Sequence, residues 1–375
     1  MGFKIVKMCL IYWILPVFFA CLANGSAAQS ETEKFKGYRL NQIQLIGSHN
    51  SYKTGMEPAL LALISKMDSA RASVFAYGHI SLKEQLNMGL RNLELDVVHD
   101  PTGGRFTKPM AFEWMELSAI TPQPYDNNKD LDKPGLKVLH VPDVDIRSEH
   151  LLFIDCLKEL LQWSIQHPGH IPVTVTINAK DRSEKGLMPL LPFGAAALDS
   201  IDFEIKQVFP NDKLITPDLI RGKGKNLAHT ILGKGWPLLE NLSGRFLFVL
   251  DETGQKLLDY TRGHEALEGR VMFVNEADGS PNAAFMIIND PQKDGKRIKE
   301  MVEKGYMVRT RSDANTVEAR AENYDRFKAA MLSGAQVITT DYYLPSTYFP
   351  SSFRIVFPTG GYIRANPVAR PKKRP

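Results

Sequence analysis

The sequence predicts a single α/β domain of the TIM (β/α)8 barrel type, regular or irregular. Short apolar runs alternate with helical stretches between residues 42 and 341 of the 375-residue chain, and about eight of these runs have the length of a strand. Such alternation is typical of parallel strands covered by helices. A chain of this size can bury one large core. A doubly wound open sheet is the alternative, because periodicity does not count strands reliably.

Eight apolar runs are predicted as the barrel strands, and a ninth is an additional candidate. In order, the eight are residues 42–46, 90–97, 136–141, 172–178, 246–251, 271–275, 306–310 and 336–341; the additional run is 283–288. The stretches predicted as helices between them are residues 57–69, 81–88, 150–167, 198–208, 294–304 and 316–333. Gly89, Gly305 and Gly334 each precede a strand, as expected of residues that interrupt regular structure.

The two ends of the chain differ in composition from the part between them. Lys4 and Lys7 precede an apolar run at 9–22, and mostly small residues follow through Ala28. This pattern predicts a signal peptide at 1–28 and a secreted or periplasmic protein after its cleavage; lipoprotein anchoring at Cys21 is the alternative. The barrel domain is then expected at 29–362. The basic, Pro-rich residues 363–375 are predicted to be a disordered tail.

Charge and cysteine content exclude several classes of protein. The net charge is +4, but no basic stripe is interleaved with aromatic residues, so nucleic acid is not expected as a partner. Cys156 is the one cysteine left after signal cleavage, which excludes an intrachain disulfide in the mature chain. The basic tail could contact anionic lipid at a membrane surface. The sequence leaves the oligomeric state open.

Polar residues end or follow seven of the predicted strands. They are His49 and Asn50, Glu94 and Asp96, His140, Asn178 with Lys180, Asp251, Arg309 with Arg311, and Asp341. In a barrel these strand ends converge on one mouth. Alternation along a strand places Glu94 and Asp96 on the same face. A histidine and an amide beside two carboxylates suit phosphate chemistry assisted by Ca²⁺ or Mg²⁺, whereas Zn²⁺ favours His and Cys ligands.

The same residues also allow interpretations without catalysis. Either histidine could be a buried core residue, and the two carboxylates could be solvated. Arg309 and Arg311 could form structural ion pairs with Asp313 or Asp341. Alternatively, the arginines and Lys180 could bind a phosphate or sugar hydroxyls, since Arg offers a bidentate fork.

Seven stretches together resemble a known family over roughly residues 40–345. They are 47–52 (GSHNSY), 77–86 (YGHISL…QL), 89–97 (GLRNLELDV), 138–145 (VLHVPDVD), 163–172 (WSIQHPGHIP), 309–316 (RTRSDANT) and 333–342 (SGAQVITTDY). In these motifs the chain resembles the calcium-dependent phosphatidylinositol-specific phospholipase C family of bacteria and fungi. The resemblance implies a phospholipase C-like phosphodiesterase barrel that uses Ca²⁺.

The resemblance also implies roles for individual residues. His49 and His140 match the two catalytic histidines of the family, and Asn50, Glu94 and Asp96 match three of its calcium ligands. Asn178 stands where eukaryotic relatives have a fourth ligand, a Glu. Asn can coordinate Ca²⁺ through its carbonyl oxygen, but the site loses one negative charge. Lys180, Asp251, Arg309 and Arg311 are then expected to bind the substrate.

Three functions are compatible with these observations. The first is an exported calcium-dependent phosphodiesterase that cleaves phosphatidylinositol, or a soluble glycerophosphoinositol, with peripheral contact to the membrane. The second is a glycerophosphodiester phosphodiesterase, although that family has His-Arg-Gly where this chain has His49, Asn50 and Ser51. The third is a non-catalytic phosphoinositide- or glycan-binding barrel, which the departure at Asn178 keeps open.

Overall fold

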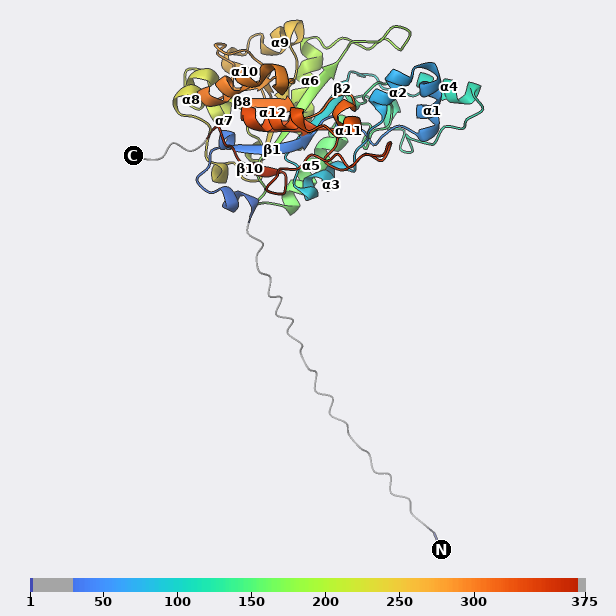
Figure 1. The fold of residues 1–375 in the computed structure, drawn as a ribbon, viewed down its shortest axis with the longest axis horizontal. Coiled ribbons are helices and arrows are strands. Elements are labelled where there is room, and N and C mark those ends of the chain that lie inside the picture. The colour runs from blue at the N-terminus through green and yellow to red at the C-terminus, as the bar shows by residue number, and fades with distance from the viewer. Residues whose placement is uncertain (3–29, 370–375) are drawn as a thin grey trace.

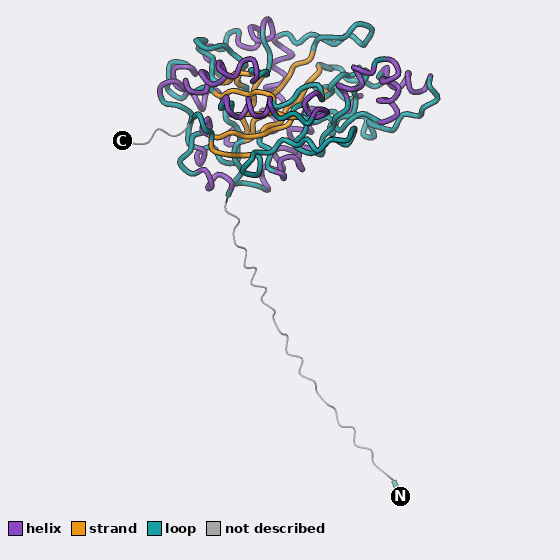
Figure 2. Tube along the Cα trace, viewed as in Figure 1, coloured by secondary structure: helices purple, strands orange, loops and turns teal. Residues whose placement is uncertain are grey.

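The computed structural model of the chain describes residues 1–2 and 30–369. Most of the predicted signal peptide, with Cys21, therefore lies outside the described residues. Eight parallel strands and two short antiparallel ones form two half-sheets at the centre of the molecule, and helices and loops surround them (Figures 1 and 2).

The first half-sheet has the strand order β10-β1-β9-β8-β7. Its strands are β1 (Ile43–Ser48), β7 (Phe285–Ile287), β8 (Met307–Arg311), β9 (Val337–Thr340) and β10 (Ile363–Ala365). The second half-sheet has the order β3-β2-β4-β5-β6. Its strands are β2 (Asn92–Val98), β3 (Lys137–Val138), β4 (Val173–Lys180), β5 (Phe246–Leu250) and β6 (Phe273–Val274). In each half-sheet the four barrel strands are parallel, and only β10 and β3 run antiparallel to their neighbours.

The two half-sheets meet at two seams. Between β6 and β7, Asn275 and Phe285 form a parallel bridge. Between β1 and β2, the backbone N–H of Arg91 donates to the carbonyl of Ile46 at 3.3 Å. A side chain at Gly47 would place its Cβ 2.4 Å from the Asn92 Cβ, so only glycine allows this approach. The eight parallel strands thus follow one another around a TIM-type barrel, which confirms the predicted fold class.

One predicted barrel strand is wrong, and the additional candidate takes a place in the barrel. Residues 136–141 yield only the two-residue β3, in which Val138 pairs antiparallel with Val97 of β2. The chain then turns, because the N–H groups of Val144 and Asp145 both donate to the carbonyl of Val141, each at 2.8 Å. Residues 283–288 supply β7 instead, between β6 and β8.

Within residues 30–369, twelve α-helices lie around and beside the strands. They are α1 (Pro58–Met67), α2 (Ser69–Phe75), α3 (Leu82–Met88), α4 (Met110–Leu117), α5 (Phe153–Gln166), α6 (Ala195–Val208), α7 (Pro217–Arg221), α8 (Leu227–Gly233), α9 (Gly254–Thr261), α10 (Pro291–Lys304), α11 (Val317–Ala321) and α12 (Asp325–Ser333). Short 3-10 helices occupy Glu31–Phe35, Leu40–Gln42, Asp130–Asp132, Asn211–Lys213, Leu239–Asn241 and Glu265–Leu267. None of the helices in the described part of the chain is long and apolar enough to span a bilayer.

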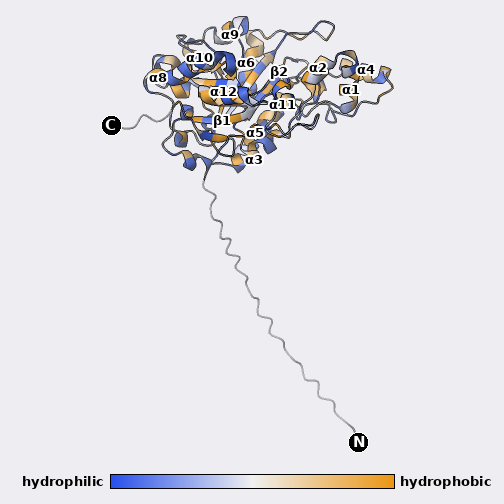
Figure 3. Cartoon of the chain, viewed as in Figure 1, coloured by the Kyte–Doolittle hydropathy of each residue, from blue (hydrophilic) through white to orange (hydrophobic). Residues whose placement is uncertain are grey.

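The helix boundaries follow from capping residues. Ser81 and Glu84 form a reciprocal capping box at the start of α3, and Gly89 ends it with a φ of 104°. The predicted helix at 316–333 is two helices, because Glu322 has a left-handed φ of 50°. Apolar residues concentrate in the strands and on the helix faces that cover them (Figure 3). Cys156 of α5 is free and buried in this core.

The predicted start of the disordered tail at residue 363 is too early. Residues Ile363–Ala365 form β10 and pair with β1, and Arg364 donates two hydrogen bonds to Gln44 at 2.7 and 2.9 Å. Asn366 is buried and its amide donates to the carbonyl of Gly334. The edge of β1 beside the seam thus has a strand partner. This pairing determines the structure of residues 363–365 despite their polar composition. Residues 370–375 lie outside the described part.

Candidate active site

One cavity of about 500 Å³ opens at the carboxyl ends of the parallel strands, and all ten predicted site residues line it. They are His49, Asn50, Glu94, Asp96, His140, Asn178, Lys180, Asp251, Arg309 and Arg311. Their convergence follows from the fold, because parallel barrel strands end at a single mouth. The roles assigned to them from the sequence remain predictions.

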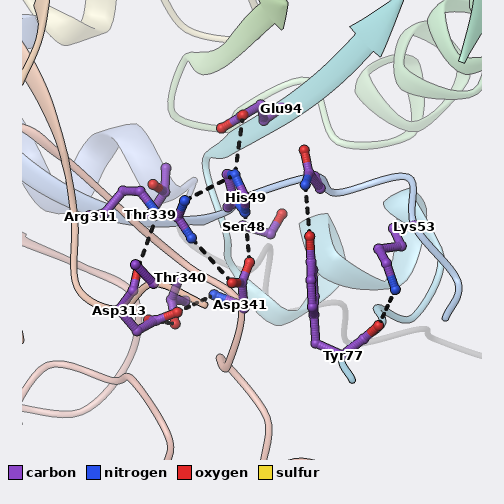
Figure 4. Close-up of polar contacts among 12 residues, drawn as sticks. Ser48, His49, Lys53, Tyr77, Glu94, Arg311, Asp313, Thr339, Thr340 and Asp341 are labelled. Atoms are coloured by element: carbon purple, nitrogen blue, oxygen red, sulfur yellow. Dashed lines mark hydrogen bonds and ion pairs between the residues drawn. The ribbon is translucent and has the colours of Figure 1, made fainter. Parts of the chain in front are cut away.

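His49, directly after β1, is held between the two half-sheets. Its Nδ1 donates to Asp341 at 2.8 Å, and its Nε2 accepts from Arg311 at 3.2 Å (Figure 4). The same Nε2 lies 3.7 Å from a carboxylate oxygen of Glu94. Burial alone would raise the pKa of Asp341, but its contacts with His49 and Arg311 outweigh burial and hold this pKa well below its ordinary value. Asp341 therefore stays ionised and fixes the orientation of the imidazole.

His140 is held by a second, independent carboxylate. Its Nδ1 donates to Asp145 at 2.8 Å, and Asp145 in turn lies 3.3 Å from the ammonium of Lys53, which is fully buried. The turn after β3 brings Asp145 back beside His140. Burial lowers the pKa of His140; Lys180 lowers it further, while the hydrogen bond to Asp145 opposes both.

Oxygen atoms of β2 converge on the end of β4. The amide of Asn178 donates to Glu94 at 2.9 Å and to Asp96 at 3.0 Å. The second oxygen of each carboxylate faces a basic residue: Lys180 donates to Asp96 at 2.8 Å, and Arg309 forms an ion pair with Glu94. Each carboxylate therefore has one oxygen that faces a basic side chain and one that faces Asn178.

Asn50, two residues after β1, adds a further side-chain oxygen to the cavity that Glu94 and Asp96 line. Its backbone is left-handed, with a φ of 48°, a conformation that Asn tolerates better than most residues. Its amide donates to the Tyr77 hydroxyl at 2.7 Å, which leaves the carbonyl oxygen available to a cation. Strained backbone of this kind persists where the surroundings over-determine it, as at ligand sites.

Asp251, Arg309 and Arg311 are the remaining predicted residues of the cavity lining. Asp251, after β5, accepts from Asn275 at 3.2 Å, and burial raises its pKa to about 6 although Arg309 opposes this. Arg309 also donates to Asn289 at 2.7 Å. Arg311 lies 3.2 Å from Asp341. Arg311 thus forms an ion pair that the sequence allowed, whereas Arg309 pairs with Glu94 and Asp251 instead of Asp313 or Asp341. Both arginines also line the cavity.

A comparison of the sequence with known protein families identifies the family of this chain. The sequence matches the family "Phosphoinositide phospholipase C, Ca2+-dependent" over residues 38–367, most of the chain. The chain belongs to this family. As a member of the calcium-dependent phosphoinositide phospholipases C, it is a phosphodiesterase whose cofactor is Ca²⁺.

One solved structure supports the fold. A calcium-dependent phosphatidylinositol-specific phospholipase C from Streptomyces antibioticus matches with a TM-score of 0.52 at 17% identity, covering 84% of this chain and 99% of the other. A calcium-dependent phosphoinositol-specific phospholipase C from Pseudomonas sp. matches with a TM-score of 0.49 at 18% identity, covering 88% of this chain and 95% of the other. No curated protein matches the sequence.

The donor set of this phospholipase fits calcium. Glu94 and Asp96 each turn one anionic oxygen toward the amide nitrogen of Asn178. A cation at that point would meet both oxygens, and Asn178 would coordinate it after a rotation that brings its carbonyl oxygen inward. All of the available donors are oxygens, which hard cations prefer. We therefore regard Asn50, Glu94, Asp96 and Asn178 as a chemically suitable calcium site.

Sequence reasoning missed several residues around the two histidines. The roles of Asp145 and Lys53 were not foreseen, although Asp145 lies in the same motif as His140. Asp341 was identified as a strand-end residue, but not as the partner of His49, because the two are 292 positions apart. The cavity rim also contains residues that no motif indicated, namely Asp181, Arg182, Glu252, Thr253, Lys256 and Asn289.

Proposed function

We propose that this phospholipase cleaves phosphatidylinositol, or a related inositol phosphodiester, by attack of a ring hydroxyl on the neighbouring phosphorus. The observation that carries the proposal is the placement of two histidines, each bonded to its own carboxylate, in one cavity with the oxygen donors of β2 and β4. General acid–base catalysis needs two such groups within reach of one substrate.

His49 is suited to the role of base. Its Nδ1 carries a proton toward Asp341, and its Nε2 accepts a hydrogen bond, so Nε2 has a lone pair for the hydroxyl proton. As the oxygen–phosphorus bond forms, Nε2 takes that proton. Asp341 then stabilises the imidazolium that results. Arg311, 3.2 Å from Nε2, is positioned to bind a phosphoryl oxygen.

His140 is suited to the role of acid. It lines both the polar cavity and an adjoining hollow of about 90 Å³ that contains Val141, Leu187 and Leu190. An apolar leaving group on this side places the departing oxygen near the imidazole. As the phosphorus–oxygen bond breaks, His140 gives its proton to that oxygen, and the products are a cyclic inositol phosphate and an alcohol.

The calcium site supplies charge for the same step. Ca²⁺ held by Asn50, Glu94, Asp96 and Asn178 would lower the pKa of the attacking hydroxyl and neutralise charge on the phosphoryl oxygens. Asn178 has no carboxylate and cannot act as a base, which supports His49 as the acceptor of the hydroxyl proton.

Turnover of radiolabelled phosphatidylinositol, with and without Ca²⁺, tests the proposed reaction. We expect calcium-dependent release of diacylglycerol and a cyclic inositol phosphate, resolved by chromatography. Glycerophosphoinositol and glycerophosphocholine are assayed in parallel. Cleavage of glycerophosphocholine without cleavage of either inositol substrate would contradict the proposal and favour a glycerophosphodiester phosphodiesterase.

Export and membrane contact are part of the same proposal. The basic and apolar pattern of residues 1–28 supports secretion. Helices α1 and α4 follow barrel strands and project to one side of the molecule, and they expose Met67 and Leu117 (Figure 1). Such residues support peripheral contact with lipid. Amino-terminal sequencing of extracellular protein and cosedimentation with phosphatidylinositol vesicles test these two points.

A further inference from the structure

We propose that Lys180 is an internal counter-cation that competes with Ca²⁺ for Asp96 and so sets the calcium affinity of the site. The inference concerns this residue alone and rests on the calcium site proposed above. It also changes the role that the sequence predicted for Lys180. Instead of only binding substrate, Lys180 first pairs with Asp96, one of the proposed calcium ligands.

The position of Lys180 carries the argument. It is the last residue of β4, two residues after Asn178, so alternation puts both side chains on the cavity side. Its ammonium donates to Asp96 at 2.8 Å and to the backbone carbonyl of His140 at 3.0 Å. The Asp96 side chain is 3% exposed, whereas that of Lys180 is 32% exposed.

The positive charge of Lys180 opposes the binding of a cation to Asp96. Asp96 is buried, and the Lys180 ammonium that contacts it supplies a compensating positive charge. Any Ca²⁺ bound to Asp96 would lie about 2.4 Å from one of its oxygens. It would therefore stand within several ångströms of the ammonium and be repelled by it.

Arg309 makes a similar ion pair but is not free to respond. Its side chain is 2% exposed, and it holds Asn289 as well as Glu94. Lys180 has a flexible stem that is one-third exposed, and it can swing toward solvent when a divalent cation takes its place. Lys180 is therefore the cation in this cavity that calcium can displace.

A matched pair of variants tests the proposal by isothermal titration calorimetry. Lys180→Met removes the charge beside Asp96 and should bind Ca²⁺ at least about tenfold more tightly than the wild type. Lys256→Met is the control, because Lys256 lines the same cavity but pairs with Asp181 and Glu252. It should leave the calcium affinity unchanged. Lys180→Arg, which keeps the charge, should bind as weakly as the wild type.

Thermal unfolding gives a second readout that does not depend on activity. Without calcium, Lys180→Met should melt at a lower temperature than the wild type, because Asp96 loses its counter-charge. Calcium should then raise its melting temperature more than that of the wild type. A merely structural lysine would lower the melting temperature without changing the calcium response.

The outcomes separate the two proposals. Equal dissociation constants for Lys180→Met and the wild type would overturn the role of Lys180 and leave the calcium site intact. Failure of both proteins to bind Ca²⁺ at millimolar concentration would overturn the calcium site, and this inference with it. If Lys180→Met does not fold, Lys180→Gln keeps a donor to Asp96 without the charge and is judged by the same criteria.

Discussion

The two half-sheets of the barrel bring different chemistry to one cavity. The half-sheet of β2, β4 and β5 supplies mainly anionic and amide oxygens, from Glu94, Asp96, Asn178 and Asp251. The half-sheet of β1, β8 and β9 supplies the basic groups and their carboxylate partner, from His49, Arg309, Arg311 and Asp341. The ion pair between Glu94 and Arg309 joins the two sides, and the His49 Nε2 lies 3.7 Å from Glu94. Except for Asn50, which follows β1, the proposed calcium ligands lie on one half-sheet, whereas the two arginines lie on the other, so mutations should distinguish cation binding from phosphate binding.

The largest expected effect comes from removing the cation that the oxygen-rich half-sheet binds. Chelation should abolish turnover of phosphatidylinositol, and added Ca²⁺ should restore it where Zn²⁺ does not, because the donors are oxygens. The measurement is turnover in metal-stripped protein with defined additions. Full activity without metal would mean that the basic half-sheet works alone, with a positively charged side chain in place of calcium.

The next largest effect tests whether each side supplies one essential histidine. His49→Ala and His140→Ala should each lower turnover by at least about 10²-fold, the usual size of a general acid–base contribution, with little change in folding. Steady-state kinetics and circular dichroism measure the two quantities. Near-normal activity in folded His140→Ala would remove this residue from the mechanism and leave both roles to the half-sheet of β1.

Calcium affinity should respond to changes at Asn178, in the half-sheet that supplies both ligand carboxylates. The two carboxylates contribute about −2 at the metal, so we expect half-activation at roughly 10⁻⁴–10⁻³ M Ca²⁺ and tighter binding in Asn178→Glu. Calorimetric titration measures both. Equal affinities would place Asn178 outside the ligand set. The matched control is Arg311→Met in the other half-sheet, which should raise KM and leave the calcium affinity unchanged.

The smallest expected effect concerns the pH dependence of His140. The acid form of this histidine is lost as pH rises through its folded-state pKa, so activity should fall on that side. Asp145 raises this pKa, and Asp145→Asn should therefore shift the midpoint of the fall to lower pH. Profiles of kcat against pH test the direction. Asp181→Asn, a change at the cavity rim, should leave the midpoint in place; a shift to higher pH in Asp145→Asn would contradict the assignment.

Sequence patterns predicted most of the fold because barrel strands are short apolar runs with clear ends. They failed at 136–141, where a run of strand-like composition pairs for only two residues and then turns. They also failed at Ile363–Ala365, where pairing with β1 overrides a polar composition. Both failures have the same cause: contacts with distant residues decide the structure of a short segment.

The candidate site was predictable to the extent that strand ends converge. Once His49, Glu94 and Asn178 are placed at the ends of parallel strands, their common cavity follows from the barrel. The partners of the histidines do not follow in this way. Lys53 reaches Asp145 from the β1 side of the barrel, and no periodicity in the sequence indicates that contact.

The pairing of β1 has a consequence for the order in which the protein is made. This strand, which ends beside His49 and Asn50, is synthesised early, but it pairs with β9 and β10, and Gln44 bonds to a residue 320 positions later. Contacts of such long range form slowly and only after the distant segment exists. We therefore expect the cavity mouth to assemble only after β9 and β10 have been synthesised.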